Sequence, residues 1–218
     1  MERVEATEIQ QGGQLALILA AERLFAERGI EAVSLRQINQ AANHRNMSAA
    51  HYHFGSREGL LEAVLMYRLP LIDARRRALL SRPDAKRDLR FFLEAFILPL
   101  SEELAPRPEG NCYIRFMQQY ERYRGDYDFA RRLTPAGIEI YNGIERLIGY
   151  LPAEVRGLRI TYFINLIHAI LASAEERIGR GDLIADAIGL ITENAIDMLT
   201  AALAAPPSAE TIDILDGH

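Results

Sequence analysis

The 218-residue sequence has no tryptophan, one lysine (Lys86) and one cysteine (Cys112). A single cysteine excludes a disulfide framework within the chain and is typical of a protein in a reducing cytoplasm. We find no uninterrupted apolar run of about 18 residues, the length that a membrane-spanning helix needs. The acidic N-terminal stretch Met1–Glu8 also lacks the basic and then apolar order of a signal peptide. We therefore expect a cytoplasmic protein without a membrane partner.

The sequence motifs of the common enzyme classes are absent as well. The chain has no glycine-rich loop for phosphates, no G-x-S-x-G, no H-E-x-x-H and no Cys/His cluster. Among the five histidines, His51 and His53 are two residues apart and lie on different sides of a helix, which is poor metal geometry. We therefore expect no enzymatic activity, no catalytic residue, no metal and no cofactor.

What the chain does have is an ordinary globular composition, 49% hydrophobic and 25% charged, with a net charge of −5. Its apolar residues recur at helical spacing without the alternation of a strand, so the sequence predicts an all-α protein. One segment departs from the acidic balance: residues 34–57 contain Arg36, Arg45 and Arg57 and no acidic residue, a formal charge of +3. A basic patch on an acidic protein favours the docking of one face onto phosphates.

This basic segment also has the pattern of a helix-turn-helix. Ser34–Leu60 reads as two short helices, a polar turn between them and a sharp break before a third helix. Ser34 is a good N-cap for the first helix, and Asn43–Asn46 has no apolar residue and is rich in residues that tolerate turn geometry. A second helix over about Met47–Phe54 begins with small side chains, which let a helix approach a surface closely. This layout places the second helix in a DNA major groove.

The residues of this segment resemble those of a known family. S-L-R-Q-I-N-Q-A-A, followed by A-x-Y-H-F-G-S-R-E-G-L-L, resembles the N-terminal DNA-binding domain of the tetracycline-repressor (TetR) family of transcription regulators. The resemblance covers Leu15–Val64, although Asn43–Asn46 makes the turn about one residue longer than the family's usual A-G-V-S. It implies an all-α fold with an N-terminal three-helix helix-turn-helix domain and a C-terminal helical bundle for ligand binding and dimerisation.

The domain boundaries follow from the helical pattern. We expect the helix-turn-helix domain over 14–60, the ligand-binding and dimerisation domain over 61–206, and flexible ends over 1–13 and 207–218. We also expect Pro70 to kink the helix that follows Ser56, and Asp84 to cap the next helix.

Two roles are predicted for the DNA-contacting side chains. Phosphate contacts are expected from Ser34, Tyr52 and Arg57, assisted by the backbone N–H groups at Ser56. Base contacts are expected from Arg45, Asn46, Ser48, Ala49 and His51, with Arg favouring guanine and Asn favouring adenine, while His53 could serve either role. The alternative for Arg45 and Asn46 is that they only form the turn.

The two long C-terminal helices predict a dimer. Apolar residues surround nearly the whole circumference of Ile160–Ala174, and the last helix has an apolar stripe that includes Ile188 and Met198. Because both helices need cover on more than one side, we expect them to pair with the same helices of a second copy in a twofold four-helix interface. The resemblance implies the same arrangement. A homodimer of this kind holds two recognition helices about 34–36 Å apart and predicts a palindromic operator.

TetR-like proteins usually hold a small-molecule pocket in the second domain. The expected lining residues are an aromatic and methionine stripe at helical spacing and three polar residues on later helices: Tyr113, Phe116, Met117, Tyr120, Tyr141, Asn165 and His168. The alternative is that the stripe is hydrophobic core and His168 a hydrogen-bonded core histidine.

Together these features predict a sequence-specific DNA-binding transcription regulator. We expect a repressor that binds double-stranded operator DNA as a homodimer and is released by a small-molecule effector. The alternatives are a helical protein-interaction module without DNA binding and, with less support, an enzyme.

Overall fold

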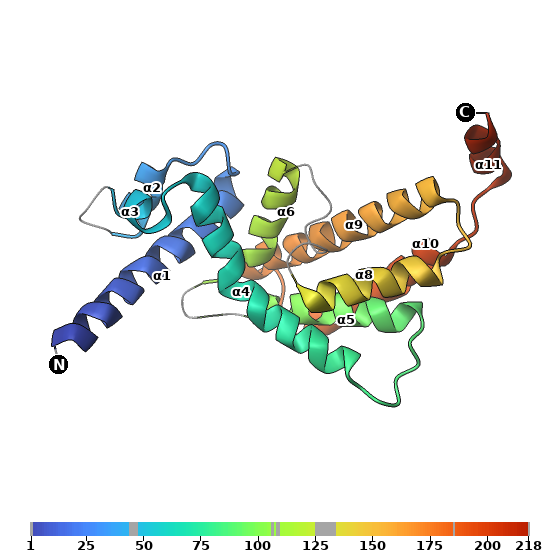
Figure 1. Cartoon of the computed structure of the whole chain (residues 1–218), viewed down its shortest axis with the longest axis horizontal. Helices are drawn as coiled ribbons and strands as arrows, with labels where there is room; N and C mark the ends of the chain where they lie inside the picture. Colours follow the sequence, from blue (N-terminus) through green and yellow to red (C-terminus); the bar gives the residue numbers. More distant parts are fainter. Residues whose placement is uncertain are drawn as a thin grey trace.

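The computed structural model describes the backbone of residues 2–43, 48–105, 107, 110–124, 134–184 and 186–217, and the side chains of these residues except 2–11 and 124. Every regular element within these ranges is a helix, and they contain no strand. The predicted all-α fold is therefore confirmed (Figure 1).

Three helices form the N-terminal domain: α1 (Glu2–Arg28), α2 (Leu35–Ala41) and α3 (Ala49–Phe54). Their shared core includes the fully buried side chains of Leu17, Phe25, Ile38 and Ala50. The helix expected from residue 14 is part of a longer one, since α1 begins at Glu2 where a flexible arm over 1–13 was expected.

The helix α4 (Arg57–Leu80) leaves this domain and crosses to the rest of the molecule (Figure 1). It is continuous through the exposed Pro70, so the proline does not end it. One side of α4 packs on α1, and its later turns pack on α5 and α8. It is therefore the covalent link between the two parts of the chain and one of the packing contacts between them.

The described C-terminal part of the chain also consists of helices. Asp88, and not Asp84 as expected, caps α5: its Oδ1 accepts a hydrogen bond from the Phe91 N–H at 3.0 Å. The acidic tail, where a flexible end was expected, contains a short helix capped by Ser208. The elements are α5 (Leu89–Ser101), η1 (Glu102–Leu104), α6 (Tyr113–Arg124), α8 (Pro135–Leu147), α9 (Ala153–Gly179), α10 (Ala187–Ala204) and α11 (Ala209–Asp216).

The helices α6 and α10 differ in what they pack against. α6 packs between α1 of the N-terminal domain and α9, whereas α10 packs on α5 and α9. A movement of α6 therefore bears on both the N-terminal domain and α9.

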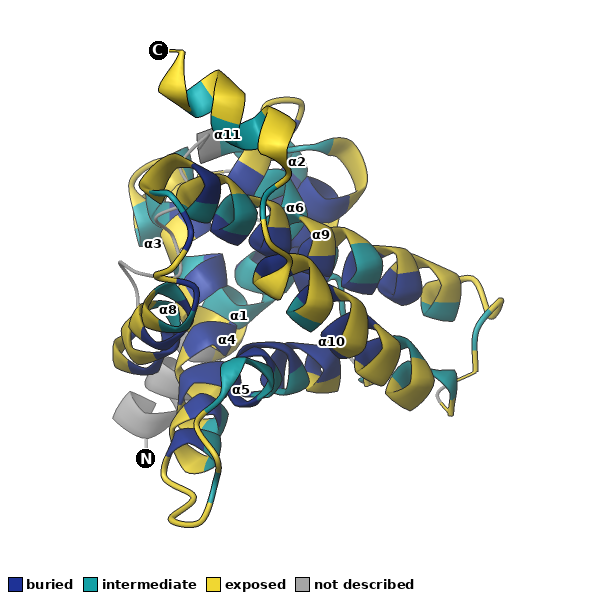
Figure 2. Ribbon diagram, turned by 90° about the vertical axis from the view of Figure 1, so that its right-hand side faces the viewer, coloured by how far each residue is buried: buried dark blue, intermediate teal, exposed yellow. Residues whose placement is uncertain are grey.

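Among the described helices, α9 and α10 are both long and apolar. Each is long and apolar enough to cross a membrane, but the core helices of soluble proteins meet the same two criteria. Less than half of the apolar stretch of each is buried within this chain. Figure 2 shows buried and exposed residues alternating along both helices. Their exposed large apolar residues include Leu158, Tyr162, Leu166, Leu190 and Met198, so this surface lacks cover within one copy.

Candidate nucleic-acid interface

The predicted helix-turn-helix segment, Ser34–Leu60, begins with a well-capped helix. The Ser34 hydroxyl accepts a hydrogen bond from the Gln37 backbone N–H at 3.3 Å, and the Gln37 side-chain oxygen accepts from the Ser34 backbone N–H at 2.8 Å. This capping box fixes the start of α2. Ser34 is exposed, as a phosphate contact requires, but its hydroxyl also donates to Gln37 Oε1.

The turn after α2 starts with a left-handed residue. Asn43 has φ of +53°, a conformation that asparagine adopts more readily than most residues, and its N–H bonds to the Gln40 carbonyl. Asn43 thus supplies the backbone geometry that glycine often supplies at a helix end. The next residues, including the predicted base contacts Arg45 and Asn46, lie outside the described residues.

The short helix α3 has two distinct faces. Ala49 and Ala50 are 4% and 0% exposed and pack on the N-terminal core. Ser48 and His51 are exposed, and so is Tyr52 at 76%, whereas His53 is half-buried with its ring against Tyr52. The expectation that Ala49 contacts a base is therefore wrong, because the approach of α3 to the core turns this residue inward. The exposed face retains the polar and aromatic candidates.

A residue that the sequence analysis missed holds α3 in place. The Asn39 side-chain oxygen accepts a hydrogen bond from the Ala50 N–H at 2.9 Å, and its Nδ2 donates to the Leu35 carbonyl at 2.8 Å. Asn39 is 1% exposed, so these bonds lie inside the protein. The only signal in the sequence was an asparagine inside a helix, where its side-chain amide can hydrogen-bond a neighbouring helix.

The junction between α3 and α4 requires glycine at two positions. Gly55 has φ of +72°, which ends α3. A Cβ on Gly59 would lie 2.1 Å from the Phe54 carbonyl oxygen, so only glycine allows this close approach of α4 to α3. Ser56 caps α4 by accepting the Gly59 N–H at 3.1 Å. The Ser56 side chain also hydrogen-bonds the Glu58 carboxylate, so both its acceptor and its donor serve the first turn of α4.

Charge at the start of α4 is mixed. Arg57 is half-buried and precedes the exposed Glu58. A hydrogen bond from its own backbone N–H lowers the pKa of Glu58, whose carboxylate also accepts from the Tyr123 hydroxyl at 3.4 Å. The exposed Arg36 on α2 adds positive charge. Arg36 and Arg57 therefore are the described arginines of the basic segment.

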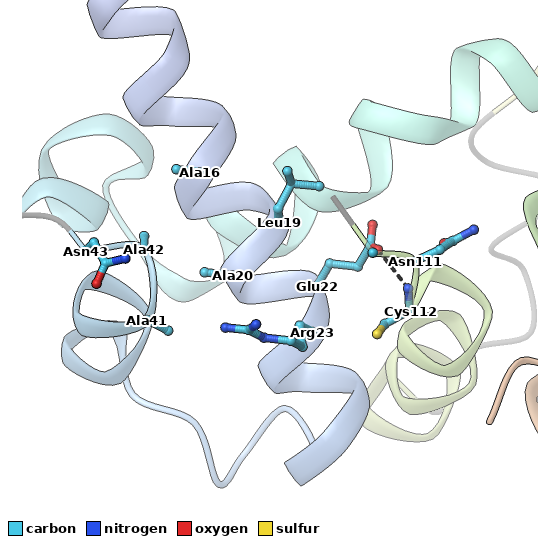
Figure 3. Close-up of a pocket in the computed structure, with 11 residues that line it drawn as sticks. Ala16, Leu19, Ala20, Glu22, Arg23, Ala41, Ala42, Asn43, Asn111 and Cys112 are labelled. Carbon is cyan, nitrogen blue, oxygen red and sulfur yellow. Dashed lines mark hydrogen bonds between the residues drawn. The ribbon is translucent and has the colours of Figure 1, made fainter. Parts of the chain in front are cut away.

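A buried ion pair connects the N-terminal domain with α4 and α6. Arg68 Nε lies 3.1 Å from Glu22 Oε2 and Arg68 Nη2 lies 3.2 Å from Glu22 Oε1, with both residues 2% exposed. Glu22 Oε1 also accepts the Cys112 backbone N–H at 3.1 Å, just before α6 (Figure 3). A pocket of about 260 Å³ lies at this junction, with Ala16, Ala42 and Cys112 among its lining residues. One carboxylate therefore contacts both α4 and the segment that leads into α6.

The start of α6 is held from the other side by α9. The carboxylate of Glu175 accepts the backbone N–H groups of Ile114 and Arg115 at 3.1 and 3.0 Å and the Arg115 Nε–H at 3.1 Å. Burial raises the pKa of Glu175 to about 7, although these hydrogen bonds oppose the rise. Carboxylates from α1 and α9 thus fix the same end of α6.

The residues expected to line a ligand pocket fall into two groups. Tyr113, Phe116 and Met117 are 0–3% exposed and belong to the hydrophobic core. Tyr120, Tyr141 and Asn165 are half-buried, and Asn165 borders a hollow of about 350 Å³ between α6 and α9. His168 is buried with its Nδ1 2.8 Å from Glu121 Oε1. The structure thus brings Tyr113, Phe116 and Met117 into one core, at the contact of α6 with its neighbours.

Comparisons with known proteins match the N-terminal domain to a family model and most of the chain to solved structures. Residues 17–64 match the family model described as "Bacterial regulatory proteins, tetR family". No curated protein matches the chain. A TetR family transcription regulator from Marinobacter aquaeolei VT8 is similar over 88% of this chain and 97% of its own, at 17% identity and a TM-score of 0.56. A TetR-like regulator from Rhodococcus sp. RHA1 is similar over 88% of this chain and 93% of its own, at 16% identity and a TM-score of 0.53. These findings confirm the predicted helix-turn-helix domain and the predicted fold.

Proposed function

We propose that this chain, whose residues 17–64 match the tetR family model of bacterial regulatory proteins, is a transcription repressor that binds a palindromic operator in the cytoplasm. The helix-turn-helix domain corresponds to residues 14–60 and the ligand-binding and dimerisation domain to 61–206.

The observation that carries the proposal is the outward face of α3. Ser48, His51 and Tyr52 are exposed side by side on a helix whose other face is fixed to the core by Ala50 and Asn39. A rigid short helix with polar side chains outward suits entry into a major groove. The flanking Arg57 and the N-cap residues of α2 and α4 are proposed to contact phosphates.

Dimer formation is proposed from the uncovered apolar surface of α9 and α10. Leu166 on α9 and Leu190 on α10 are 50% and 75% exposed, and neither helix finds cover for this face within one copy. A twofold arrangement would bury the same faces of a second copy and place two α3 helices on one DNA duplex.

Release by an effector is proposed through α6. Its start is bound by Glu22 of the N-terminal domain and by Glu175 of α9. An effector that binds the arrangement unsuited to DNA more tightly than the DNA-bound one would shift the protein away from its operator. The wall of the effector site is proposed to include Tyr113, Phe116, Met117, Tyr120, Tyr141, Asn165 and His168.

Fluorescence anisotropy with the full chain and the DNA upstream of its own gene tests this function. We expect binding that exceeds binding to unrelated DNA of equal length by about 10³-fold or more and weakens steeply with salt. Equal affinity for both duplexes would refute sequence-specific binding, and no affinity for either would support the protein-interaction alternative.

A further inference from the structure

Three buried polar atoms in the centre of the molecule have no hydrogen-bond partner among the described residues: Arg68 Nη1, Arg76 Nε and the Tyr113 hydroxyl. The three residues are 2%, 3% and 0% exposed. Buried donors are almost always paired, because an unpaired donor loses its hydrogen bond to water and gains none within the protein. Three such donors together therefore indicate a missing acceptor.

Arg76 is the member of this group with an unpaired charge. The buried carboxylates Glu22, Glu103 and Glu175 all lie within ion-pair distance of other arginines, at 3.1 Å or less. The guanidinium of Arg76 instead contacts Phe96, with Nη2 3.5 Å from its carbonyl oxygen and the guanidinium carbon 4.5 Å from its ring centre. Neither contact neutralises the charge.

The charge on Arg76 persists at neutral pH. Burial lowers the pKa of Arg76 to about 10, with Tyr113 and Asp73 opposing the drop. Asp73 is the nearest candidate to balance it, but its Oδ1 accepts the Ala136 N–H at 3.2 Å and its Oδ2 lies 3.7 Å from Arg77. A buried guanidinium without a paired anion is costly, so this position favours an incoming anion.

Tyr113 and Arg76 are close enough to interact electrostatically. Burial raises the pKa of Tyr113 and the charge of Arg76 opposes this rise, so the two groups interact and the phenol remains a protonated donor. The surroundings are apolar: the Tyr113 ring is 6.3 Å from that of Phe116, and Phe96 is 5.3 Å from Phe163. Two donors, one of them cationic, among aromatic rings are complementary to a carboxylate carried on an apolar body.

We propose that the effector of this regulator is an apolar organic acid whose carboxylate accepts hydrogen bonds from Arg76 and Tyr113. This inference rests on the proposed function and names the class of ligand for it. The apolar part of the acid packs among the aromatic rings of α5 and α6. Because Arg76 lies on α4 and Tyr113 begins α6, the carboxylate links these two helices. Arg68 lies two turns before Arg76 on α4 and pairs with Glu22 of α1. A shift of α4 on ligand binding therefore reaches the N-terminal domain through this pair.

The test compares two acids with their neutral amides on the full chain: benzoate with benzamide, and octanoate with octanamide. Thermal unfolding and calorimetric titration report ligand binding, and anisotropy with the upstream DNA reports release. The variants are Arg76→Met, Tyr113→Phe and the control Arg77→Met, whose side chain is 59% exposed on the same helix.

We expect at least one acid to raise the midpoint of unfolding and weaken DNA binding, while its amide does neither. Arg76→Met and Tyr113→Phe should bind that acid about tenfold more weakly or worse, and Arg77→Met should match the wild type. Without ligand, Arg76→Met should unfold at the same temperature as the wild type or higher, because an unpaired buried charge is removed. A purely structural arginine would lower it.

Three results would overturn the inference: no acid binds the wild type, the amides bind as well as the acids, or the Arg76 and Tyr113 variants bind the acid as the wild type does. The last result would mean that water fills the acceptor position. Should Arg76→Met fail to fold, Tyr113→Phe, which removes one oxygen atom, decides the question. Wild-type protein that binds its DNA but no acid refutes the ligand class alone, whereas absence of DNA binding refutes the proposed function.

Discussion

The side-chain oxygen of Asn39 in α2 accepts the backbone N–H of Ala50 in α3 at 2.9 Å. Since both residues are buried and Asn39 also bonds to α2 itself, this contact sets the distance and angle between the two helices. The exposed face of α3 is therefore oriented by a residue that never reaches its surface.

Replacing Asn39 with alanine should reduce DNA affinity more than it reduces stability. The Ala50 N–H would be left buried without an acceptor, which costs about 1–3 kcal/mol, and α3 would lose its fixed orientation. Urea unfolding and DNA anisotropy measure the two effects. Gln40→Ala, at an exposed position on the same helix, is the control and should change neither. Normal operator affinity in the Asn39 variant would refute this role.

Arg57 and His51 should affect DNA binding in different ways. Arg57→Ala should weaken binding to all sequences alike and reduce the slope of log affinity against log salt by about one, as expected for one lost phosphate contact. His51→Ala should instead change the preference among operator variants, by about 1–3 kcal/mol at one base pair. Anisotropy over a set of single-base operator variants distinguishes them, and equal losses across the set for both would contradict the assignment.

Replacing one member of the buried pair of Glu22 and Arg68 should lower the free energy of unfolding more than replacing both. Arg68→Met alone should destabilise the protein by about 3–5 kcal/mol because it leaves the Glu22 carboxylate buried and unpaired. The double variant with Glu22→Met should recover much of that loss, although the Cys112 N–H then lacks its acceptor. Urea unfolding measures both. A double variant that loses the sum of the two single effects would show that the residues act independently.

Glu175 should make the protein less stable as the pH rises towards neutrality. Its pKa is raised by burial from 4.5 to about 7, so the folded state binds a proton that the unfolded state releases. The stabilisation is complete below about pH 4.5 and is lost as the pH rises through about 7, amounting to roughly 3 kcal/mol. Unfolding of wild type and Glu175→Gln across this range measures it. The wild type should lose stability relative to the variant, and identical pH profiles would contradict the expectation.

The exposed face of α10 should hold the dimer together. Leu190→Glu places a charge where a second copy is expected to pack, so it should yield monomers in sedimentation equilibrium. Leu71→Glu, a residue 49% exposed on α4, is the matched control and should remain dimeric. A wild-type protein that is a stable monomer at micromolar concentration would refute the interface itself.

The sequence predicted those features that depend on neighbouring residues. Ser34 was expected to cap its helix, and it accepts the N–H three residues on, a relationship visible within one turn. The outward direction of His51 also followed from helical spacing. Asp84 and Asp88 were harder to distinguish, because both precede an apolar helical pattern and only the observed bond to Phe91 decides between them.

Features that depend on distant residues could not be predicted. Glu22 and Arg68 are 46 positions apart, and Asn39 reaches a helix beyond the turn. Ala49 was expected to face DNA, and its inward direction depends on where α1 lies. The unpaired state of Arg76 required knowing every neighbour of α4. The sequence therefore indicated the surface that we propose to bind DNA, whereas the contacts that orient this surface required the fold.

The central claim is that two copies of the chain present their α3 helices to one duplex. The most direct measurement combines the mass of the complex in sedimentation with the footprint of the protein on the DNA upstream of its gene. We expect two chains per duplex and two symmetric protected half-sites, centred about one helical turn, roughly 34–36 Å, apart or a multiple of it. A single chain per duplex, or protection without twofold symmetry, would contradict the account.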